Sequence, residues 1–449
     1  MDAHSTILLP ARQLLAIAAL LVLVGCGSPR PEALQGEVCK SMATAGRTPF
    51  PWPDIYQSAL AADLTIVAAP APVPPATPRI EAVRNKLAAQ AAGRQEGQQR
   101  AAPFRRAPQP PTRILSVSAG GAWGAFSTGF LEGWGENTAE PRPAFDVVTG
   151  VSTGSMIAPV IFLGDAKRMA RLRALYSGLS DKDVFTKRGL LALPTATSLY
   201  DNAPLRRKVE EMMDEEMVEA IAAQSEHRTL LVLAANLDSG VPDVFDLTAI
   251  ASSKDMAMAD KRRRIIAAIM ASAALPLAFP PEFIDNNLYV DGGVRLHVFF
   301  TREVLAALPG RPLDVTIVVS GDLKVERECT GKQHLDLLSI AGRTATIAID
   351  QLLRSSVESM LTVGRQPGNV ARYVDAADLI DYGAAVPPPG APKPGPCRIG
   401  SERTSDDQFD PEFQSCLARY GYEMGKSAPI PWRLTIRGGR VGRGPAPGT

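Results

Sequence analysis

Short apolar runs alternate with segments of helical periodicity along most of the chain after residue 112. Short segments rich in apolar residues, typical of buried strands, occur at 114–118, 145–148, 229–237, 288–290 and 313–320, with further strands expected at 244–250 and 432–436. Helical patterns occur at 125–134, 155–163, 166–179, 204–224, 265–274, 334–361 and 410–426. Strands and helices in this order predict an α/β domain.

The N-terminal region carries a different pattern. Residues 14–24 form an uninterrupted apolar run of about eleven residues, too short to span a bilayer, and Arg12 precedes it. The run ends in Leu23-Val24-Gly25-Cys26, which resembles the lipobox of bacterial lipoproteins. We therefore expect residues 1–25 to be a signal peptide and Cys26 to carry lipid; a plain secretory signal with an accidental cysteine is the alternative. Gly27, not Asp, follows, as expected for an outer-membrane lipoprotein of the cell envelope facing the periplasm.

Proline and alanine dominate the next stretch. We interpret residues 26–112 as a lipid-anchored tether with a stiff linker at 70–78 and a weakly amphipathic helix within 80–100, part of it able to pack on the domain. The domain itself is expected at 113–437, followed by a disordered tail at 438–449.

Bulk composition excludes several classes of protein. The 449 residues are 45% hydrophobic and 21% charged, which is ordinary for a globular protein, and a net charge of +1 argues against nucleic-acid binding. Besides Cys26 the cysteines are Cys39, Cys329, Cys397 and Cys416, which permit three connectivities in an oxidising compartment; Cys397 with Cys416 is a reasonable pair. No two cysteines have C-x-x-C spacing, so a zinc site is not expected.

One motif joins a predicted strand directly to a predicted helix. Gly150-Val-Ser152-Thr-Gly154 is a G-x-S-x-G, in which a strained turn lifts the serine hydroxyl out of the sheet. The two glycines leave room for the neighbouring strand and helix. The alternative is a loop with a helix-capping serine.

Two glycine-containing turns follow other predicted strands. Residues 119–124 do not complete a G-x-G-x-x-G, because Ala119 stands at the first glycine position, but such a turn can direct backbone N–H groups at a developing oxyanion. The strand at 288–290 delivers Asp291-Gly292-Gly293 at its C-terminal end, where ligands bind in open parallel sheets. Asp291 is alternatively a turn residue.

The glycine turn, the G-x-S-x-G and the Asp-Gly-Gly stand in an order that resembles the patatin-like phospholipase family over about residues 113–300. The resemblance implies a three-layer α/β fold with a mostly parallel central sheet flanked by helices. It implies that Ser152 is the nucleophile and Asp291 its base. Gly120 and Gly121 would supply the oxyanion hole, and neither a metal nor another cofactor is required.

The sequence departs from the family pattern at three positions. Ala119 replaces a glycine, Trp123 stands where a basic residue is usual, and His297 stands where Asn is common. Loss of the basic residue weakens the expectation of an anionic substrate. His297 is also the only serious candidate to complete a histidine-containing triad, with a buried structural role as the alternative.

The implied function is a lipid acyl hydrolase of the phospholipase A or lysophospholipase type, acting on phospholipid or another lipid ester through an acyl-enzyme. Cys26 would hold it at the membrane. A non-catalytic lipid-binding lipoprotein that keeps the fold is the main alternative, since the glycine loop is altered. A broader esterase, a thioesterase or a serine protease using the same turn is a weaker one.

Overall fold

The computed structural model describes residues 81–90 except 84, 110–189, 196–299, 312–323, 337–377 and 408–436. The predicted signal peptide, Cys26, most of the tether, three of the four remaining cysteines and the tail at 438–449 lie outside these ranges. The chain divides into two compact units, Met1–Pro72 with Val325–Asp350 and Val73–Lys324 with Gln351–Thr449. The described part of the first unit is residues 337–350 of helix α14; the sheet and the candidate site belong to the second.

A mostly parallel sheet forms the centre of the second unit, as predicted. Its parallel strands are, in spatial order, β10 (Val370–Val374), β9 (Leu313–Val318), β1 (Thr112–Val117), β2 (Val147–Val151) and β5 (Thr229–Asn236). Three antiparallel strands complete it: β6 (Pro242–Asp246) and β8 (Asn287–Asp291) pair with β5, and β7 (Glu282–Ile284) pairs with β8. β7 and β10 are short and were not predicted.

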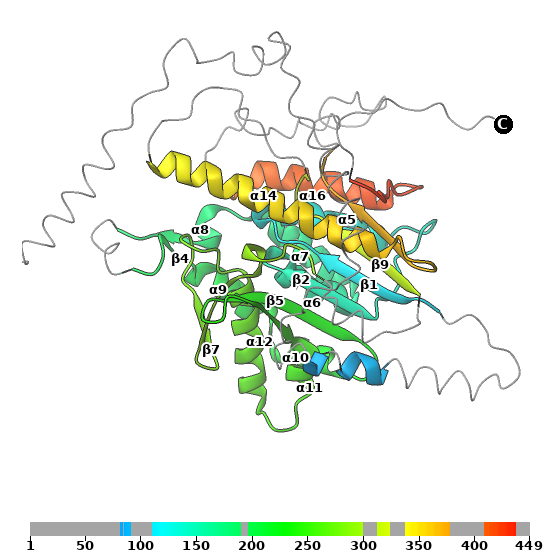
Figure 1. The fold of residues 1–449 in the computed structure, drawn as a ribbon, viewed down its shortest axis with the longest axis horizontal. Helices are drawn as coiled ribbons and strands as arrows, with labels where there is room; N and C mark the ends of the chain where they lie inside the picture. The colour runs from blue at the N-terminus through cyan, green and yellow to red at the C-terminus, as the bar shows by residue number, and fades with distance from the viewer. Residues whose placement is uncertain are drawn as a thin grey trace, which may run out of the picture. The chain divides into compact units, whose positions relative to one another are not determined.

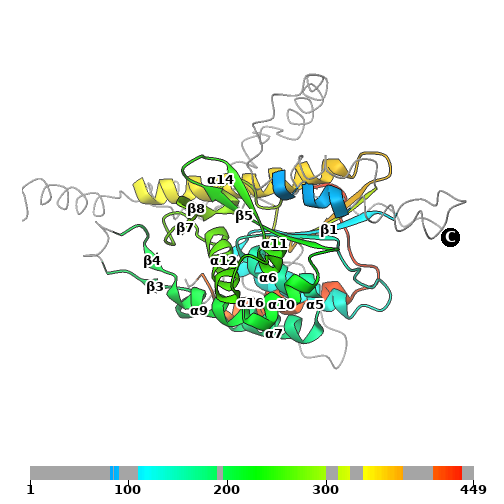
Figure 2. The same ribbon diagram turned by 90° about the horizontal axis from the view of Figure 1, so that it is seen from below.

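Helices cover both faces of this sheet (Figures 1 and 2). Successive residues of a strand point to opposite faces, so Ile114 and Leu115 belong to two different hydrophobic clusters. The larger cluster contains buried residues of the helices α5 (Gly124–Gly135), α6 (Thr153–Leu163), α7 (Ala166–Gly178), α12 (Met258–Ser272) and α16 (Pro411–Lys426). The smaller contains residues of the segment 81–90 and of the second half of α14 (Leu337–Val363). The predicted three-layer α/β architecture is therefore confirmed.

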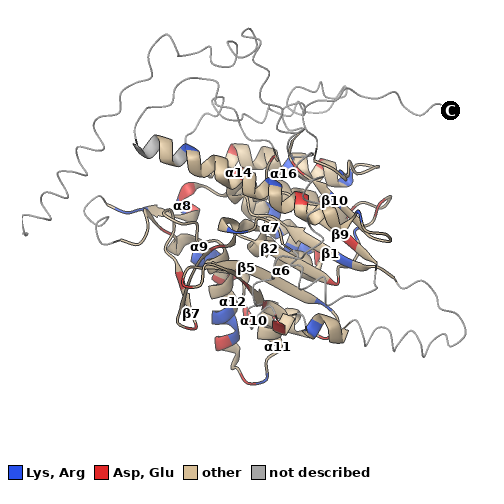
Figure 3. Cartoon of the chain, viewed as in Figure 1, with Lys and Arg blue, Asp and Glu red and all other residues tan. Residues whose placement is uncertain are grey.

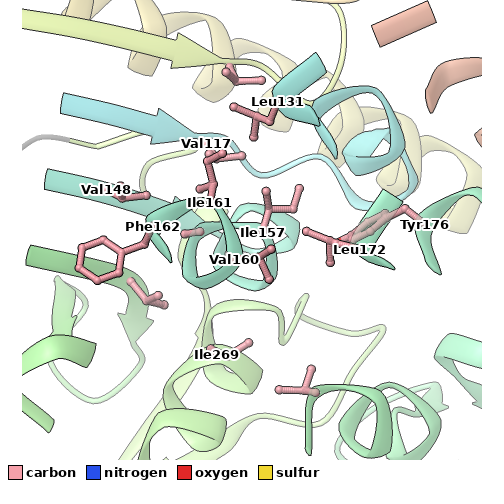
Figure 4. Close-up of a cluster of buried hydrophobic side chains, with 14 of the residues drawn as sticks. Val117, Leu131, Val148, Ile157, Val160, Ile161, Phe162, Leu172, Tyr176 and Ile269 are labelled. Carbon is pink, nitrogen blue, oxygen red and sulfur yellow. The ribbon is translucent and has the colours of Figure 1, made fainter. Parts of the chain in front are cut away.

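Helix α6 lies at the centre of the larger cluster. Its residues Ile157, Val160 and Ile161 are buried against side chains from β1, β2, α7 and α12 (Figure 4). A helix that is apolar on nearly all sides is stable only inside such a core. The element that follows Ser152 is thus rigidly held, which fixes the serine relative to the sheet.

The predicted helix at 204–224 is two helices. α9 (Ala203–Met212) ends before Asp214, whose carboxylate accepts a hydrogen bond from the Met217 N–H at 2.8 Å and caps α10 (Glu215–Ala223). A capping aspartate inside a helical pattern is a start signal, but the apolar spacing continues across the break and by itself indicates one helix.

Two predicted strands also need correction. The run 244–250 is a strand only to Asp246, whose side chain accepts from Ala249 N–H at 2.8 Å and begins helix α11 (Leu247–Ser252). The stretch 432–436 forms no regular strand in the described structure; a single antiparallel bridge links Arg433 to Tyr373. Capping chemistry overrode β propensity in the first case.

Positive charge gathers on α12 at Lys261–Arg264 (Figure 3). Arg262 donates to the Met213 and Glu210 carbonyls near the end of α9, at 2.7 and 2.5 Å. Arg263 pairs with Asp260, and Arg264 with Asp285. Much of this charge is therefore engaged within the domain, as is typical of a charged helix face.

Part of the predicted tether packs on the domain. Residues 81–90 are helical, and Val83 and Leu87 are buried against the sheet, each about 2% exposed. Lys86 donates to Asp246 at 2.8 Å and to Thr248 at 2.7 Å. The folded unit therefore includes residues from before position 113.

Two further findings bear on the predictions. Cys416 is disulfide-bonded, and because its partner lies outside the described ranges, the pairing with Cys397 stays a prediction. None of the helices in the described ranges combines the length and apolar character needed to cross a bilayer.

Candidate active site

The G-x-S-x-G turn joins β2 directly to α6. Ser152 has φ 53° and ψ −122°, a conformation that L-residues rarely adopt. A Cβ at Gly150 would lie 2.3 Å from the Gly154 carbonyl oxygen, and one at Gly154 would lie 2.3 Å from the Val117 carbonyl oxygen. Only glycine fits at either position. Both glycines therefore leave the room that the neighbouring strand and helix need, as predicted.

Neighbouring serines hold the strained backbone of Ser152 on both sides. Its N–H donates to Ser272 Oγ at 2.9 Å, and its carbonyl accepts from Ser155 N–H at 2.8 Å and from Ser155 Oγ at 2.6 Å. Ser272 is completely buried at the end of α12. The sequence does not identify Ser272 as a site residue, because nothing local indicates which distant N–H its hydroxyl meets.

Asp291 reaches the same edge of the sheet as Ser152, although not by the expected rule. Its strand β8 runs antiparallel to β5, so the rule for parallel strands does not apply. Register explains its place: Val151 pairs with Leu233 of β5, and Asp291 pairs with the next residue, Ala234. A Cβ at Gly292 would lie 2.4 Å from the Leu233 carbonyl oxygen, so glycine permits the close approach.

The Ser152 hydroxyl lies close enough to the Asp291 carboxylate to lower the pKa of that group. The carboxylate also accepts from Gly293 N–H at 2.7 Å. Burial raises the pKa of Asp291 from its usual 3.8 to about 6, against the lowering effect of these two groups. The carboxyl group is 4% exposed, yet it is ionised at neutral pH and can accept a proton from the serine.

The glycine turn between β1 and α5 supplies candidate oxyanion donors. Gly120 precedes a 3₁₀ turn, η2 (Gly121–Trp123), whose first N–H groups have no partner within the turn. Among the described residues neither Gly120 nor Gly121 donates a backbone hydrogen bond elsewhere. Gly121 has φ 53°, and a Cβ at Gly120 would lie 1.9 Å from the Ser320 carbonyl oxygen. Gly120 is therefore required because a side chain would have no space, and Gly121 is favoured by its positive φ, although a Cβ there would meet no atom within 4 Å.

The three departures from the family pattern take structural positions. Ala119 donates its N–H to the His297 carbonyl at 3.0 Å, which ties the glycine turn to the chain after Asp291. Trp123 packs edge-on against Phe413, with ring centroids 5.4 Å apart. Burial lowers the pKa of His297 to about 4, and neither ring nitrogen has a hydrogen-bond partner among the described residues. His297 is thus a neutral buried residue that does not contact Ser152 through a hydrogen bond.

An apolar pocket opens beside Ser152 and Gly121. Its walls come from α6, α7, α9 and the segment after α12, with lining side chains that include Met156, Leu172, Leu175, Tyr176, Leu179, Val184, Leu205, Val209, Met212, Phe279 and Phe409. The only charged lining side chain, Lys208, is 3.1 Å from Asp183 Oδ1. Tyr176 meets Thr153 Oγ1 at 2.6 Å. The pocket is therefore suited to a hydrocarbon chain.

Within the described ranges, no three His, Cys, Asp or Glu side chains converge closely enough to hold a metal ion.

Comparison with known proteins gives a family match over the same part of the chain. The family model described as patatin-like phospholipase matches residues 115–301. Two similar proteins are named cGAMP-activated phospholipase. The one from Escherichia coli (strain TW11681) is 28% identical over 199 residues, 41% of this chain. The one from Pseudomonas aeruginosa (strain BWHPSA011 / Pa011) is 27% identical over 299 residues, 61% of this chain and 85% of that protein. The match spans about half of the Escherichia coli protein, 53% of its length.

Solved structures with detectable similarity are distant. VipD from Legionella pneumophila aligns with a TM-score of 0.35 at 13% identity, covering 71% of this chain and 66% of that one. Human GIVD cytosolic phospholipase A2 aligns with a TM-score of 0.33 at 13% identity, covering 79% and 64%.

Proposed function

Residues 115–301 belong to the patatin-like phospholipase family, and from this we propose that the protein is a lipid acyl hydrolase that uses Ser152 as nucleophile and Asp291 as base. The observation that carries the proposal is the closeness of the Ser152 hydroxyl to the buried Asp291 carboxylate, whose pKa it lowers, together with the apolar pocket that Ser152 lines. A serine hydroxyl becomes an effective nucleophile when an adjacent base takes its proton. A carboxylate in direct contact does this without a histidine.

In the first half-reaction Ser152 Oγ attacks the ester carbonyl carbon while its proton passes to Asp291. The carbonyl oxygen becomes an oxyanion, which the N–H groups of Gly120 and Gly121 stabilise in this proposal; the support is that neither donates a backbone hydrogen bond among the described residues. Collapse of the tetrahedral intermediate breaks the bond to the leaving alcohol, which takes the proton from Asp291. The product is a Ser152 acyl ester.

In the second half-reaction water attacks the acyl carbon, giving its proton to the Asp291 carboxylate. The second tetrahedral intermediate collapses, Ser152 Oγ recovers the proton, and a fatty acid leaves. A pKa of about 6 suits both steps, because Asp291 is a base at neutral pH and still a sufficient acid for the departing alkoxide.

The apolar pocket identifies the part of the substrate that it binds. Its lining is almost wholly hydrocarbon, and the single lysine is engaged by Asp183. Burying an acyl chain there is favourable by about 0.8 kcal/mol for each CH₂ group. We infer that the acyl chain occupies the pocket and that the alcohol part of the lipid remains outside.

The test compares hydrolysis of a nitrophenyl ester series of increasing chain length by wild type, Ser152→Ala and Asp291→Asn. Ser252→Ala is a matched control, because that hydroxyl lies on α11 and bonds only to helix carbonyls. We expect wild type and control to prefer longer chains and both site variants to lose activity by about a thousandfold or more. Equal rates for Ser152→Ala and wild type would refute the proposal.

A fluorophosphonate probe separates this function from a non-catalytic lipid-binding role. An activated serine should be labelled in the folded wild type and not in Ser152→Ala. Binding of lipid without labelling or hydrolysis would favour the non-catalytic alternative. Hydrolysis of short esters without release of fatty acid from phospholipid would favour a broader esterase.

We also propose that Cys26 is lipidated and anchors the protein in the bacterial outer membrane, facing the periplasm. The support is the Leu23–Cys26 lipobox after an apolar run of suitable length. Incorporation of a labelled palmitate analogue into wild type but not Cys26→Ala tests the modification, and membrane fractionation tests the location. Labelled protein in the Cys26→Ala variant would refute it.

A further inference from the structure

Three leucines are exposed on loops beside the pocket. Leu277 is 79% exposed, Leu199 is 49% exposed and Leu275 is 38% exposed. Leu277 also has φ 68°, a backbone conformation that is uncommon for any residue except glycine. A large apolar side chain held out into solvent by a strained backbone indicates a role other than packing.

Backbone hydrogen bonds join the two loops that carry these leucines. Leu199 N–H donates to the Leu277 carbonyl at 2.8 Å, and Tyr200 N–H donates to the Ala278 carbonyl at 2.9 Å. The rings of Tyr200 and Phe185 are 4.5 Å apart, and Phe185 lies 6.0 Å from Phe279. The loops therefore form one supported surface, not two independent flexible segments.

The segment that carries Leu275 and Leu277 also contributes to the wall of the pocket beside Ser152. Ala273 and Phe279, on either side of Leu275 and Leu277, line the pocket together with Ser152. Leu275 and Leu277 are therefore exposed apolar residues within a few positions of the pocket wall. Figures 1 and 2 show β4 (Tyr200–Asp201) and β7 at the same end of the molecule in both views.

Positive charge lies at the rim of the surface. Lys187, on β3 (Thr186–Lys187), is exposed and forms no ion pair with a described carboxylate. The next residue in the chain, Arg188, donates its N–H to the Leu199 carbonyl at 3.1 Å, and its side chain pairs with Asp201. Apolar side chains next to an unpaired cation are the combination that favours an anionic lipid surface.

We propose that Leu199, Leu275 and Leu277 form an interfacial docking surface that inserts into a phospholipid membrane, with Lys187 facing anionic headgroups. This proposal deepens the proposed function, on which it rests: docking brings the pocket opening to the lipid, so that an acyl chain can enter without crossing water. The basic run on α12 does not serve this purpose, because much of its charge is engaged within the domain.

The first experiment measures how deeply residue 277 enters the bilayer. It does not depend on hydrolysis or on an acyl anchor. Full-length Ser152→Ala protein carrying Leu277→Trp is mixed with phosphatidylglycerol vesicles that contain brominated acyl chains. The matched control is Leu434→Trp, because Leu434 is 64% exposed and follows the bridge to β10, at the opposite edge of the sheet from β7. We expect fluorescence quenching of Leu277→Trp beyond that of the parent, and none beyond it for Leu434→Trp.

The second experiment separates docking from chemistry. The double variant Leu275→Ser with Leu277→Ser should hydrolyse a soluble short-chain ester at the wild-type rate and release fatty acid from anionic vesicles about tenfold more slowly or worse, since two inserted leucines are lost. Leu434→Ser should match wild type on both substrates. Both leucines protrude, so an unchanged thermal unfolding midpoint is expected and verifies the fold.

The two proposals fail in different ways. If the wild type hydrolyses no ester but Leu277→Trp is strongly quenched, the proposed enzymatic function is refuted and the docking surface is supported. Equal quenching at positions 277 and 434, or full vesicle hydrolysis by the double serine variant, would overturn the docking proposal. Loss of self-association in the double variant without any quenching would assign the surface to a second copy of the chain and equally overturn it.

Discussion

Replacing Asp291 with Asn should make the protein inactive and more stable. At neutral pH the wild type holds an ionised carboxylate that is 4% exposed and whose pKa is raised to about 6 by burial. Asn has the same shape, still accepts from Gly293 N–H, and carries no charge to desolvate. Removing the charge therefore removes the free-energy cost of desolvating the carboxylate in the folded state. The same charge is needed for catalysis, because it makes Asp291 a base.

The magnitude follows from the pKa of Asp291 in the two states. The difference between its usual 3.8 and about 6, at about 1.36 kcal/mol for each pH unit, amounts to about 3 kcal/mol above pH 7. The sign is that of an acid whose pKa is raised on folding: the unfolded chain loses its proton first, so stability falls as pH rises from 3.8 to about 6. At pH 5 the same relation gives a destabilisation of about 1.6 kcal/mol, half of the value above pH 7.

Urea unfolding of wild type and Asp291→Asn at pH 5 and pH 8 measures this difference. We expect Asp291→Asn to be more stable at both values, with an excess at pH 8 about twice that at pH 5. In parallel, kcat/KM of the wild type for a soluble ester should fall as pH drops through about 6, because the base becomes protonated. An Asp291→Asn protein that is less stable at pH 8, with the same deficit at pH 5, would refute the reasoning.

Three further substitutions test other parts of the structure. Gly154→Ala should prevent native folding, since its Cβ would lie 2.3 Å from the Val117 carbonyl oxygen; soluble yield and circular dichroism measure this, and a folded, active variant would contradict it. Ser272→Ala leaves the partly buried Ser152 N–H without its acceptor, so we expect a loss of about 1 kcal/mol in stability and a lower kcat with little change in KM for a short ester. Leu87→Ala should cost about 2–5 kcal/mol in urea unfolding, because this side chain is 2% exposed in the core; an effect below about 0.5 kcal/mol would mean that the segment 81–90 is a true tether.

Local patterns predicted most of the elements that surround the site. The buried strand at 229–237 and the helices at 166–179 and 410–426 agree with β5, α7 and α16 to within one or two residues. These elements are long, strongly periodic and bounded by clear breaks, so short-range information suffices. Where the pattern continued across a capping aspartate, as at Asp214, it misled, because apolar spacing does not record which backbone N–H a carboxylate accepts from.

The amino-acid sequence by itself determined the chemical parts of the candidate site: a serine between two glycines, an aspartate before two more, and a turn with free N–H groups. Only the tertiary structure decided how they meet. β8 had to pair antiparallel with β5 in the register that sets Asp291 beside Ala234, and Ser272 had to reach Ser152 from a helix end 120 residues away. Pairing register and the meeting of distant side chains depend on packing of the whole sheet and its helices, and no local stretch of residues encodes that.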